Sequence, residues 1–134
     1  MVPLTRRSAK IFKRLIAGLC WQGEAGERSR KVDNAPGAYM AVSVEACWPN
    51  LFSVTHYGEQ NGDLMADPDM VFWLSPEDGK VYPVSFRNDY AGHSNEAMTF
   101  GQDGKIESWD AAQMRDMREF ADMWMRNIAN QQEV

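Results

Sequence analysis

The sequence predicts an α+β fold in which an antiparallel sheet of four or five strands is flanked by an N-terminal and a C-terminal helix. Within residues 38–104, short stretches carry apolar side chains at every second position, which is typical of half-buried strands, and turn-forming residues separate them. Both ends of the chain instead show spacings of three and four, which indicates amphipathic helices. We expect a single domain over residues 1–134, with both helices mainly on one face of the sheet.

Residues 1–37 are expected to form a basic helix and then a loop. Apolar residues recur at helical spacing up to Trp21, with lysines and arginines between them. Thr5 or Ser8 can cap the start of this helix, and the glycines at 23–26 can end it. The polar residues 22–37 are then predicted to be an exposed loop.

The sheet is expected within residues 38–104. A tight turn at 48–50 joins the first two alternating stretches into a hairpin, and a turn rich in Pro, Asp and Gly at 75–80 joins the next two. The expected strands are residues 39–45, 51–57, 69–74 and 81–86, with a fifth at 96–100.

A C-terminal helix is predicted over residues 108–130, opening at Ser108, because its large apolar residues fall on one stripe. We expect residues 130–134 to fray. Three pairs of opposite charge stand four residues apart on the other side of the helix: Arg115 and Glu119, Arg118 and Asp122, and Asp122 and Arg126.

Composition and charge predict an ordinary cytoplasmic protein. With 134 residues, of which 44% are hydrophobic, the chain is long enough to bury one core. Two cysteines are too few for a disulfide scaffold, and no stretch approaches the roughly 18 consecutive apolar residues of a membrane helix. The net charge of −5 is uneven, since residues 1–31 carry +6 and the remainder carries −11. A basic arm can contact phosphates, and an acidic body can contact a basic partner.

Carboxylates are crowded at residues 59–69, between the second and third expected strands. Close carboxylates repel one another, so they require solvent, backbone donors or a cation. Together with His56 they could bind a divalent cation. An EF-hand loop, however, needs oxygen ligands at alternate positions, and in this run apolar residues stand among the acids. We therefore predict no metal and no cofactor. The four acids are Glu59, Asp63, Asp67 and Asp69.

Two further interpretations of this run stay open. In the first, a histidine near a strand end acts as a general acid or base that a carboxylate orients, although no motif of a known reaction class accompanies it. In the second, which we favour, Asn61 and Gly62 form a turn, Asp63 and Asp67 accept hydrogen bonds from nearby backbone amides, and Glu59 and Asp89 pair with Arg87 or nearby donors. The candidate catalytic residues are His56, Glu59, Asp63 and Asp89, with His93 as a second histidine.

Three segments resemble a bacterial family of unknown function, akin to the YqiB-like family, whose members are accessory proteins of plasmids and integrative elements. Its members carry HYYEQNGDLMxDPxM, then P-[IV]-S-[YF]-x-[NQ]-D, and a C-terminal helix ending in FAxxWxRNL. The corresponding segments here are residues 56–70, 83–89 and 120–128, and the likeness covers the chain from about Tyr39 onwards. Gly58 stands where members have a second tyrosine, which removes a ring from the strand end. The resemblance implies a mobile-element protein that acts by binding and brings no catalytic residues.

The leading hypothesis is a non-catalytic cytoplasmic protein, a monomer or homodimer, whose acidic body binds a protein partner. The resemblance extends this partner to a host defence complex, which the protein would inhibit in the manner of an anti-CRISPR or anti-restriction protein. The predicted binding residues are Glu59, Asp63, Asp67, Asp69, Glu77 and Asp78.

Two alternatives remain. One is a metal-dependent or acid/base enzyme that uses the region from His56 to Asp63. The other is nucleic-acid binding through the basic first helix, whose phosphate-contacting residues would be Arg6, Arg7, Lys10, Lys13 and Arg14.

Overall fold

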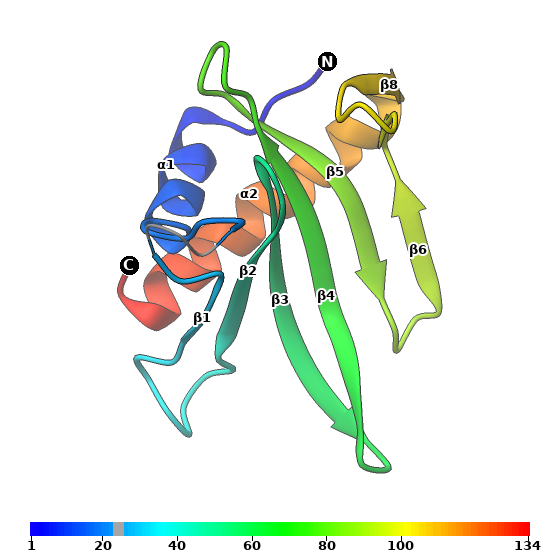
Figure 1. The fold of residues 1–134 in the computed structure, drawn as a ribbon. Coiled ribbons are helices and arrows are strands. Elements are labelled where there is room, and N and C mark those ends of the chain that lie inside the picture. Colours follow the sequence, from blue (N-terminus) through cyan, green and yellow to red (C-terminus); the bar gives the residue numbers. More distant parts are fainter. Residues whose placement is uncertain (23–25) are drawn as a thin grey trace.

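The computed structural model describes residues 1–22 and 26–134, which form a six-stranded antiparallel sheet, a two-stranded sheet and two helices (Figure 1). The strands of the large sheet follow chain order from β1 to β6, and β7 pairs with β8. The elements are α1 (Arg6–Leu15), β1 (Ser29–Val32), β2 (Val42–Trp48), β3 (Leu51–Gln60), β4 (Asp63–Leu74), β5 (Val81–Asn88), β6 (His93–Glu96), β7 (Met98–Phe100), β8 (Ile106–Trp109) and α2 (Ala111–Gln132). The predicted α+β class is confirmed.

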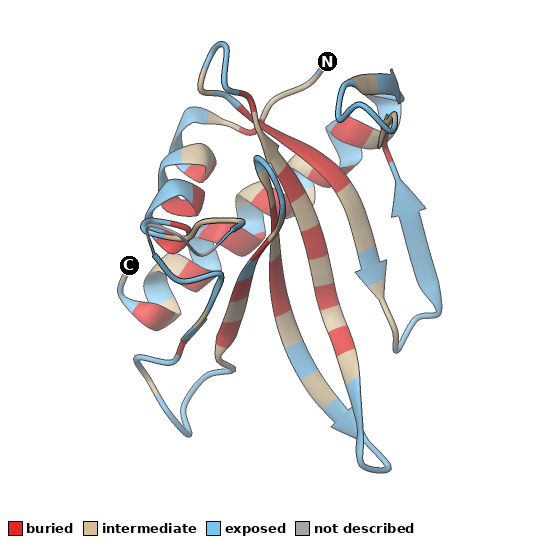
Figure 2. Ribbon diagram, in the orientation of Figure 1, coloured by how far each residue is buried: buried red, intermediate tan, exposed pale blue. Residues whose placement is uncertain are grey.

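Both helices pack on one face of the six-stranded sheet, as expected. The ring of Phe12 on α1 lies 6.0 Å from that of Phe52 on β3 and 5.1 Å from that of Phe72 on β4. On α2, the ring of Phe120 lies 5.1 Å from that of Phe86 on β5. The buried residues therefore line the sides of the helices and strands that face each other (Figure 2). We call the opposite face of the sheet the open face.

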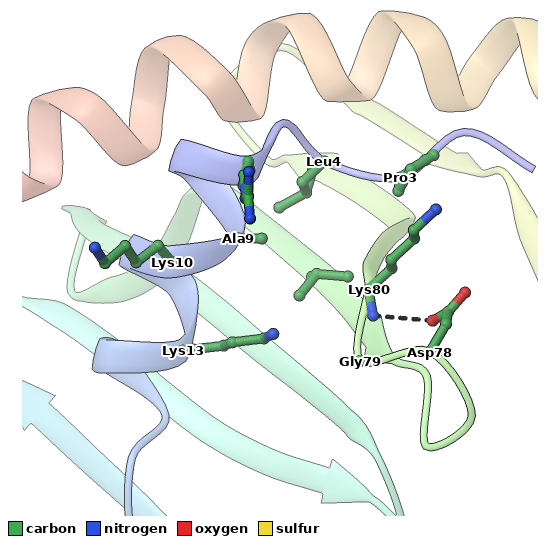
Figure 3. A pocket seen from close by; sticks show the side chains of 10 residues that line it. Pro3, Leu4, Ala9, Lys10, Lys13, Asp78, Gly79 and Lys80 are labelled. Carbon is green, nitrogen blue, oxygen red and sulfur yellow. Dashed lines mark hydrogen bonds between the residues drawn. The ribbon is translucent and has the colours of Figure 1, made fainter.

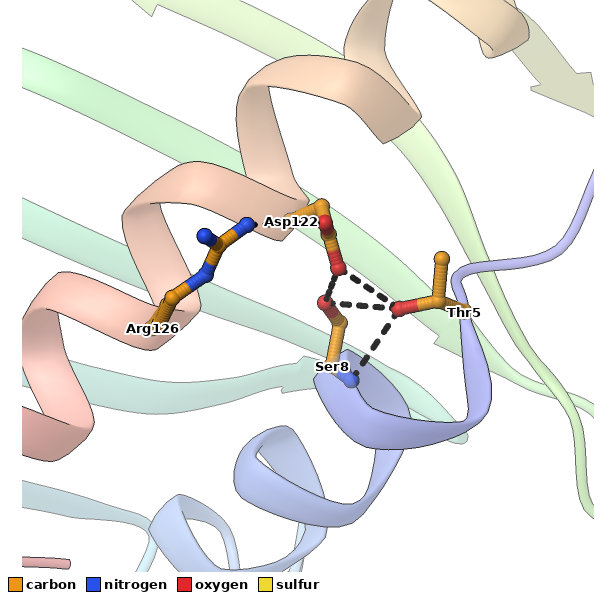
Figure 4. Close-up of polar contacts among 4 residues, drawn as sticks. All are labelled: Thr5, Ser8, Asp122 and Arg126. Atoms are coloured by element: carbon orange, nitrogen blue, oxygen red, sulfur yellow. Dashed lines mark hydrogen bonds and ion pairs between the residues drawn. The ribbon is translucent and has the colours of Figure 1, made fainter.

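A polar cluster joins the two helices (Figure 4). Thr5 caps α1, because its hydroxyl oxygen accepts a hydrogen bond from the Ser8 backbone N–H at 3.3 Å. The hydroxyls of Thr5 and Ser8 both donate to Asp122 Oδ1, each at 2.7 Å. Arg126 lies 3.2 Å from the other oxygen of Asp122. Of the three ion pairs expected on α2, this is the one that forms within the described residues.

The first part of the chain differs from the expected helix and exposed loop. The α-helix ends at Leu15, shortly before Gly18, whose φ of 82° departs from helical geometry. Part of the expected loop forms the edge strand β1, whose polar sequence lacks apolar alternation. Arg30 on β1 donates to the backbone oxygens of Leu15 and Ala17, at 3.2 and 2.6 Å. Of the helix end expected at 23–26, residues 23–25 lie outside the described part.

The sheet has more and longer strands than expected. The acidic run is not a loop, because β3 and β4 extend through it to a two-residue turn. The expected strand at 96–100 is divided at Ala97, which pairs with Val84 by a backbone hydrogen bond of 2.7 Å. After Ala97 the chain leaves the sheet edge and forms β7, which pairs with β8, a strand that was not expected.

The C-terminal helix is shifted towards the C-terminus relative to its predicted bounds. Its cap is Asp110 and not Ser108, because the Asp110 carboxylate accepts hydrogen bonds from the backbone of Ala112 and Gln113. The expected fraying from residue 130 is wrong, since Gln132 is fully buried. Its side chain bonds to residues 34 and 40, which lie in the connection between β1 and β2. No helix in the described part of the chain is both long and apolar enough to span a membrane.

Candidate functional site

The acidic run forms the tip of the β3–β4 hairpin. Gln60 and Asp63 pair across the strands, and Asn61 and Gly62 form the turn with φ values of 54° and 87°. Positive φ at both turn positions matches the twist of the flanking strands, and Asn-Gly is a preferred sequence for it. The predicted turn at these two residues is therefore present, and it explains this part of the run without a ligand.

One side of the hairpin presents exposed aromatic and apolar residues. His56 faces α2, so Tyr57 points to the open face, and Glu59, two residues later, points the same way. Leu64 joins them because it pairs directly with Glu59 across the strands. Tyr39, Tyr57 and Leu64 line a pocket of about 530 Å³ and are 51%, 41% and 68% exposed. We call Tyr39, Tyr57, Glu59 and Leu64 the hairpin surface.

A tyrosine from another strand connection occupies the space beside Gly58. The Tyr90 hydroxyl donates a hydrogen bond to the Glu59 backbone oxygen at 3.4 Å, and a Cβ at position 58 would collide with that hydroxyl. The strand end therefore has an aromatic ring beside it although position 58 is a glycine. Tyr90 supplies one from the connection between β5 and β6.

Further from the tip, acidic side chains connect β4 with β5 and with the turn that follows β5. Asp89 accepts a hydrogen bond from the Ala66 backbone N–H at 2.7 Å, and its other oxygen lies 3.2 Å from Arg87. Arg87 also lies 3.8 Å from Asp69. Burial raises the pKa of Asp69, against hydrogen bonding to Thr55 and the charge of Arg87, which lower it. These contacts fix the pairing of β4 with β5.

His56 lies between the sheet and α2. The Trp124 indole N–H donates to His56 Nδ1 at 3.3 Å, and the two rings meet edge to face with centroids 5.3 Å apart. Burial lowers the pKa of His56, although the charge of Asp67 acts in the opposite direction. Asp67 itself accepts a hydrogen bond of 3.0 Å from the Asn88 side chain. His56 thus acts as a neutral hydrogen-bond acceptor that positions α2.

The structure does not bring the candidate catalytic residues together. His56 packs against α2, Glu59 and Asp63 are exposed at the hairpin tip, and Asp89 holds the Ala66 backbone. His93 is exposed on β6, where its ring contacts the Asn95 amide at 3.0 Å. Across residues 1–22 and 26–134, no three His, Cys, Asp or Glu side chains are placed to hold a metal ion.

The other predicted site residues lie at the opposite end of the sheet. Glu77 and Asp78 belong to the turn between β4 and β5, roughly 35 Å along β4 from the hairpin tip. The basic residues of α1 lie beside this turn and divide into two groups. Arg6, Lys10 and Lys13 line a pocket with the turn, whereas Arg7 and Arg14 are exposed outside it.

Sequence reasoning missed the apolar members of the hairpin surface and Lys80, which lines the pocket beside α1. Tyr57 and Leu64 occupy the outward positions of alternating strands, and this alternation was the signal that could have found them. Lys80 follows the Gly79 turn and has no motif of its own.

The sequence model of a family described as "Domain of unknown function (DUF6908)" matches residues 10–134. No curated protein and no solved structure matches the chain.

Proposed function

The chain belongs to this family of domains of unknown function, and we propose that it is a non-catalytic protein that binds a protein partner through the hairpin surface. The observation that supports this proposal is the exposure of Tyr39, Tyr57 and Leu64 around one pocket. Exposed apolar side chains that cluster in this way are typical of protein interfaces, in which tyrosines often contribute most of the binding energy.

The charge of this surface favours a partner with a basic face. Glu59 lies directly beside Leu64, and Asp63 precedes it at the exposed turn. Asp33 also lines the pocket, whereas Lys31 is the cation that the same pocket contains. Complementary charge accelerates association, and the apolar side chains provide the area that is buried on binding.

The experiment is affinity capture with the purified, tagged chain from a lysate of the host bacterium, at low and at physiological salt. The double variant Tyr57→Ser/Leu64→Ser should lose the captured protein. The matched control is Trp109→Ser/Met123→Ser, which removes two apolar side chains of similar exposure outside the hairpin surface and should retain it. Loss in both double variants, or retention in both, would contradict the proposal.

Charge is tested separately with two single reversals. Glu59→Lys should weaken capture most strongly at low salt, because the lysine introduced there repels a basic partner. Glu77→Lys makes the same change at an exposed acid of the distant turn and should leave capture unchanged. Equal weakening by both variants would show that total charge, and not the hairpin surface, decides binding.

From the resemblance to the YqiB-like accessory proteins, we also infer a cytoplasmic protein of a mobile element whose partner belongs to a host defence complex. A small protein that occupies a nucleic-acid-binding surface with its acidic residues would inhibit such a complex. Expression of the wild-type chain should then raise the plating efficiency of a restricted or CRISPR-targeted phage. The double variant Tyr57→Ser/Leu64→Ser should not raise the plating efficiency of the phage. An equal rise with the variant and with the wild-type chain would contradict the inference.

A further inference from the structure

A second pocket, of about 830 Å³, lies at the end of the sheet that is distant from the hairpin surface (Figure 3). The N-terminal segment and α1 form one wall, and the turn between β4 and β5 forms the other. The two walls are held together by a backbone hydrogen bond of 2.7 Å from Leu4 to Val81. Its size falls within the range of about 300–1,000 Å³ that is usual for small-molecule sites.

Cationic residues line both walls of this pocket. Arg6, Lys10 and Lys13 stand four and three residues apart, so they share one side of α1. Lys13 extends towards the turn, where its ammonium lies 3.9 Å from the Cβ position of Gly79, whereas Lys10 points away from the turn (Figure 3). Lys80 enters from the opposite wall.

The carboxylate in the pocket lining does not neutralise these cations. Asp78 Oδ1 accepts a hydrogen bond of 2.9 Å from the Lys80 backbone N–H, and Oδ2 accepts one of 3.1 Å from the Tyr82 hydroxyl. The backbone bond from Lys80 is the main reason that the pKa of Asp78 is lowered, so this group is ionised at neutral pH. Within the described part of the chain, none of the four cations belongs to an ion pair. The lining therefore carries a net charge of +3.

We propose that this pocket binds a small molecule that carries a diphosphate or triphosphate group. An anion of that charge would offset the net positive charge of the lining, and lysine ammonium groups are common phosphate ligands. The apolar part of the lining leaves room for an uncharged portion of the ligand beside the phosphates. It consists of Pro3, Leu4, Ala9 and Val81.

A small ligand fits this arrangement better than a nucleic-acid strand. Arg7 and Arg14 lie outside the pocket, whereas Lys80 joins Arg6, Lys10 and Lys13 from the opposite wall, so the cations of the site do not belong to α1 alone. The acidic remainder of the chain, with a net charge of −11, would also repel an extended polyanion.

The test is isothermal titration of the full chain with inorganic triphosphate and, in a second arm, with a short single-stranded DNA. Lys13→Gln and Lys80→Gln should each weaken triphosphate binding about tenfold or more, because each removes one charge-assisted contact. Arg7→Gln and Arg14→Gln are the matched controls, since they remove the same charge from the outer side of α1. These controls should bind triphosphate within about twofold of the wild-type chain.

Three outcomes would overturn the proposal. One is the absence of saturable triphosphate binding at millimolar concentrations in low salt. Another is an equal loss of affinity in the pocket variants and in the controls. The third is tighter binding of DNA with equal sensitivity to all four substitutions, which would assign phosphate contacts to the whole helix. Far-ultraviolet circular dichroism establishes that each variant is folded. Capture of a protein partner should be unchanged in Lys13→Gln and Lys80→Gln, which separates this site from the hairpin surface.

Discussion

Substitution of Asp122 should show how strongly the two helices depend on one carboxylate. Its Oδ1 accepts hydrogen bonds from Thr5 and Ser8, each at 2.7 Å, and the Ser8 side of the cluster is buried at 1% exposure. Hydrogen bonds to charged groups contribute about 1.5–3 kcal/mol each, and the one-third exposure of Asp122 favours the lower end. Asp122→Ala should therefore lower the free energy of unfolding by about 3 kcal/mol. For a chain of this length, that is a fall in Tm of about 10 °C.

The pH dependence gives this prediction a sign. Hydrogen bonds from Ser8 and then from Thr5 lower the pKa of Asp122 in the folded protein. The stabilisation is therefore fully present above the unfolded value of about 3.9 and is lost as pH falls through the lowered pKa. Asp122→Asn, which retains an oxygen acceptor without charge, should lose about half as much stability as Asp122→Ala at pH 7. The difference in the free energy of unfolding between Asp122→Asn and the wild-type chain should shrink below about pH 4.

Thermal unfolding followed by circular dichroism measures both effects. Glu119→Ala is the matched control, because it removes an exposed acid from the same helix and should change stability by less than about 0.5 kcal/mol. The reasoning is refuted if Asp122→Ala unfolds at the Tm of the control. It is also refuted if the difference between Asp122→Asn and wild type persists unchanged into strong acid.

Three further predictions concern the contacts of α2. Trp124→Phe removes the hydrogen bond that the indole donates to neutral His56, so the pKa of His56 should rise towards its ordinary value, as measured by NMR titration. An unchanged or lower pKa would contradict the role of His56 as a neutral hydrogen-bond acceptor. Since burial lowers this pKa, His56 should also reduce wild-type stability as pH falls from about 6.5, and a His56→Gln variant should lose that part of the pH dependence. Gln132→Ala should lower the free energy of unfolding by about 1–3 kcal/mol in urea titrations, because it leaves backbone groups of Asn34 and Met40 without partners. An unchanged free energy of unfolding would instead support the expectation that the C-terminal end frays.

The alternation of side chains and the turn residues were sufficient to predict the fold class. The hairpin turn at Asn61 and Gly62 follows from the conformations that these two residues adopt readily. The strand β1 could not be predicted, because an edge strand needs only backbone pairing with its neighbour and its sequence carries few apolar residues. The order at Gln132 was also hidden, since it depends on contacts with residues about 100 positions earlier in the chain.

The charged residues of α1 and of the acidic run were visible in the sequence, whereas the apolar members of the hairpin surface and the arrangement of the site were not. The crowded acids were visible, yet their division between an exposed tip and a paired region depends on the register of β4 with β5. Likewise, the basic residues of α1 were named from the sequence, whereas the pocket also includes Lys80, which tertiary packing places on the opposite wall. The local sequence pattern identifies charged residues that can form a surface, whereas the long-range pairing of strands determines which of these residues lie close together.

Amide hydrogen exchange of the chain, alone and bound to the protein that it captures, tests the proposed binding surface most directly. We predict slower exchange on binding at the β3–β4 hairpin, from Tyr57 to Leu64, and in the connection that carries Tyr39. Unchanged exchange at the hairpin, with protection confined to α1 and the β4–β5 turn, would contradict the central claim that the hairpin surface binds the partner.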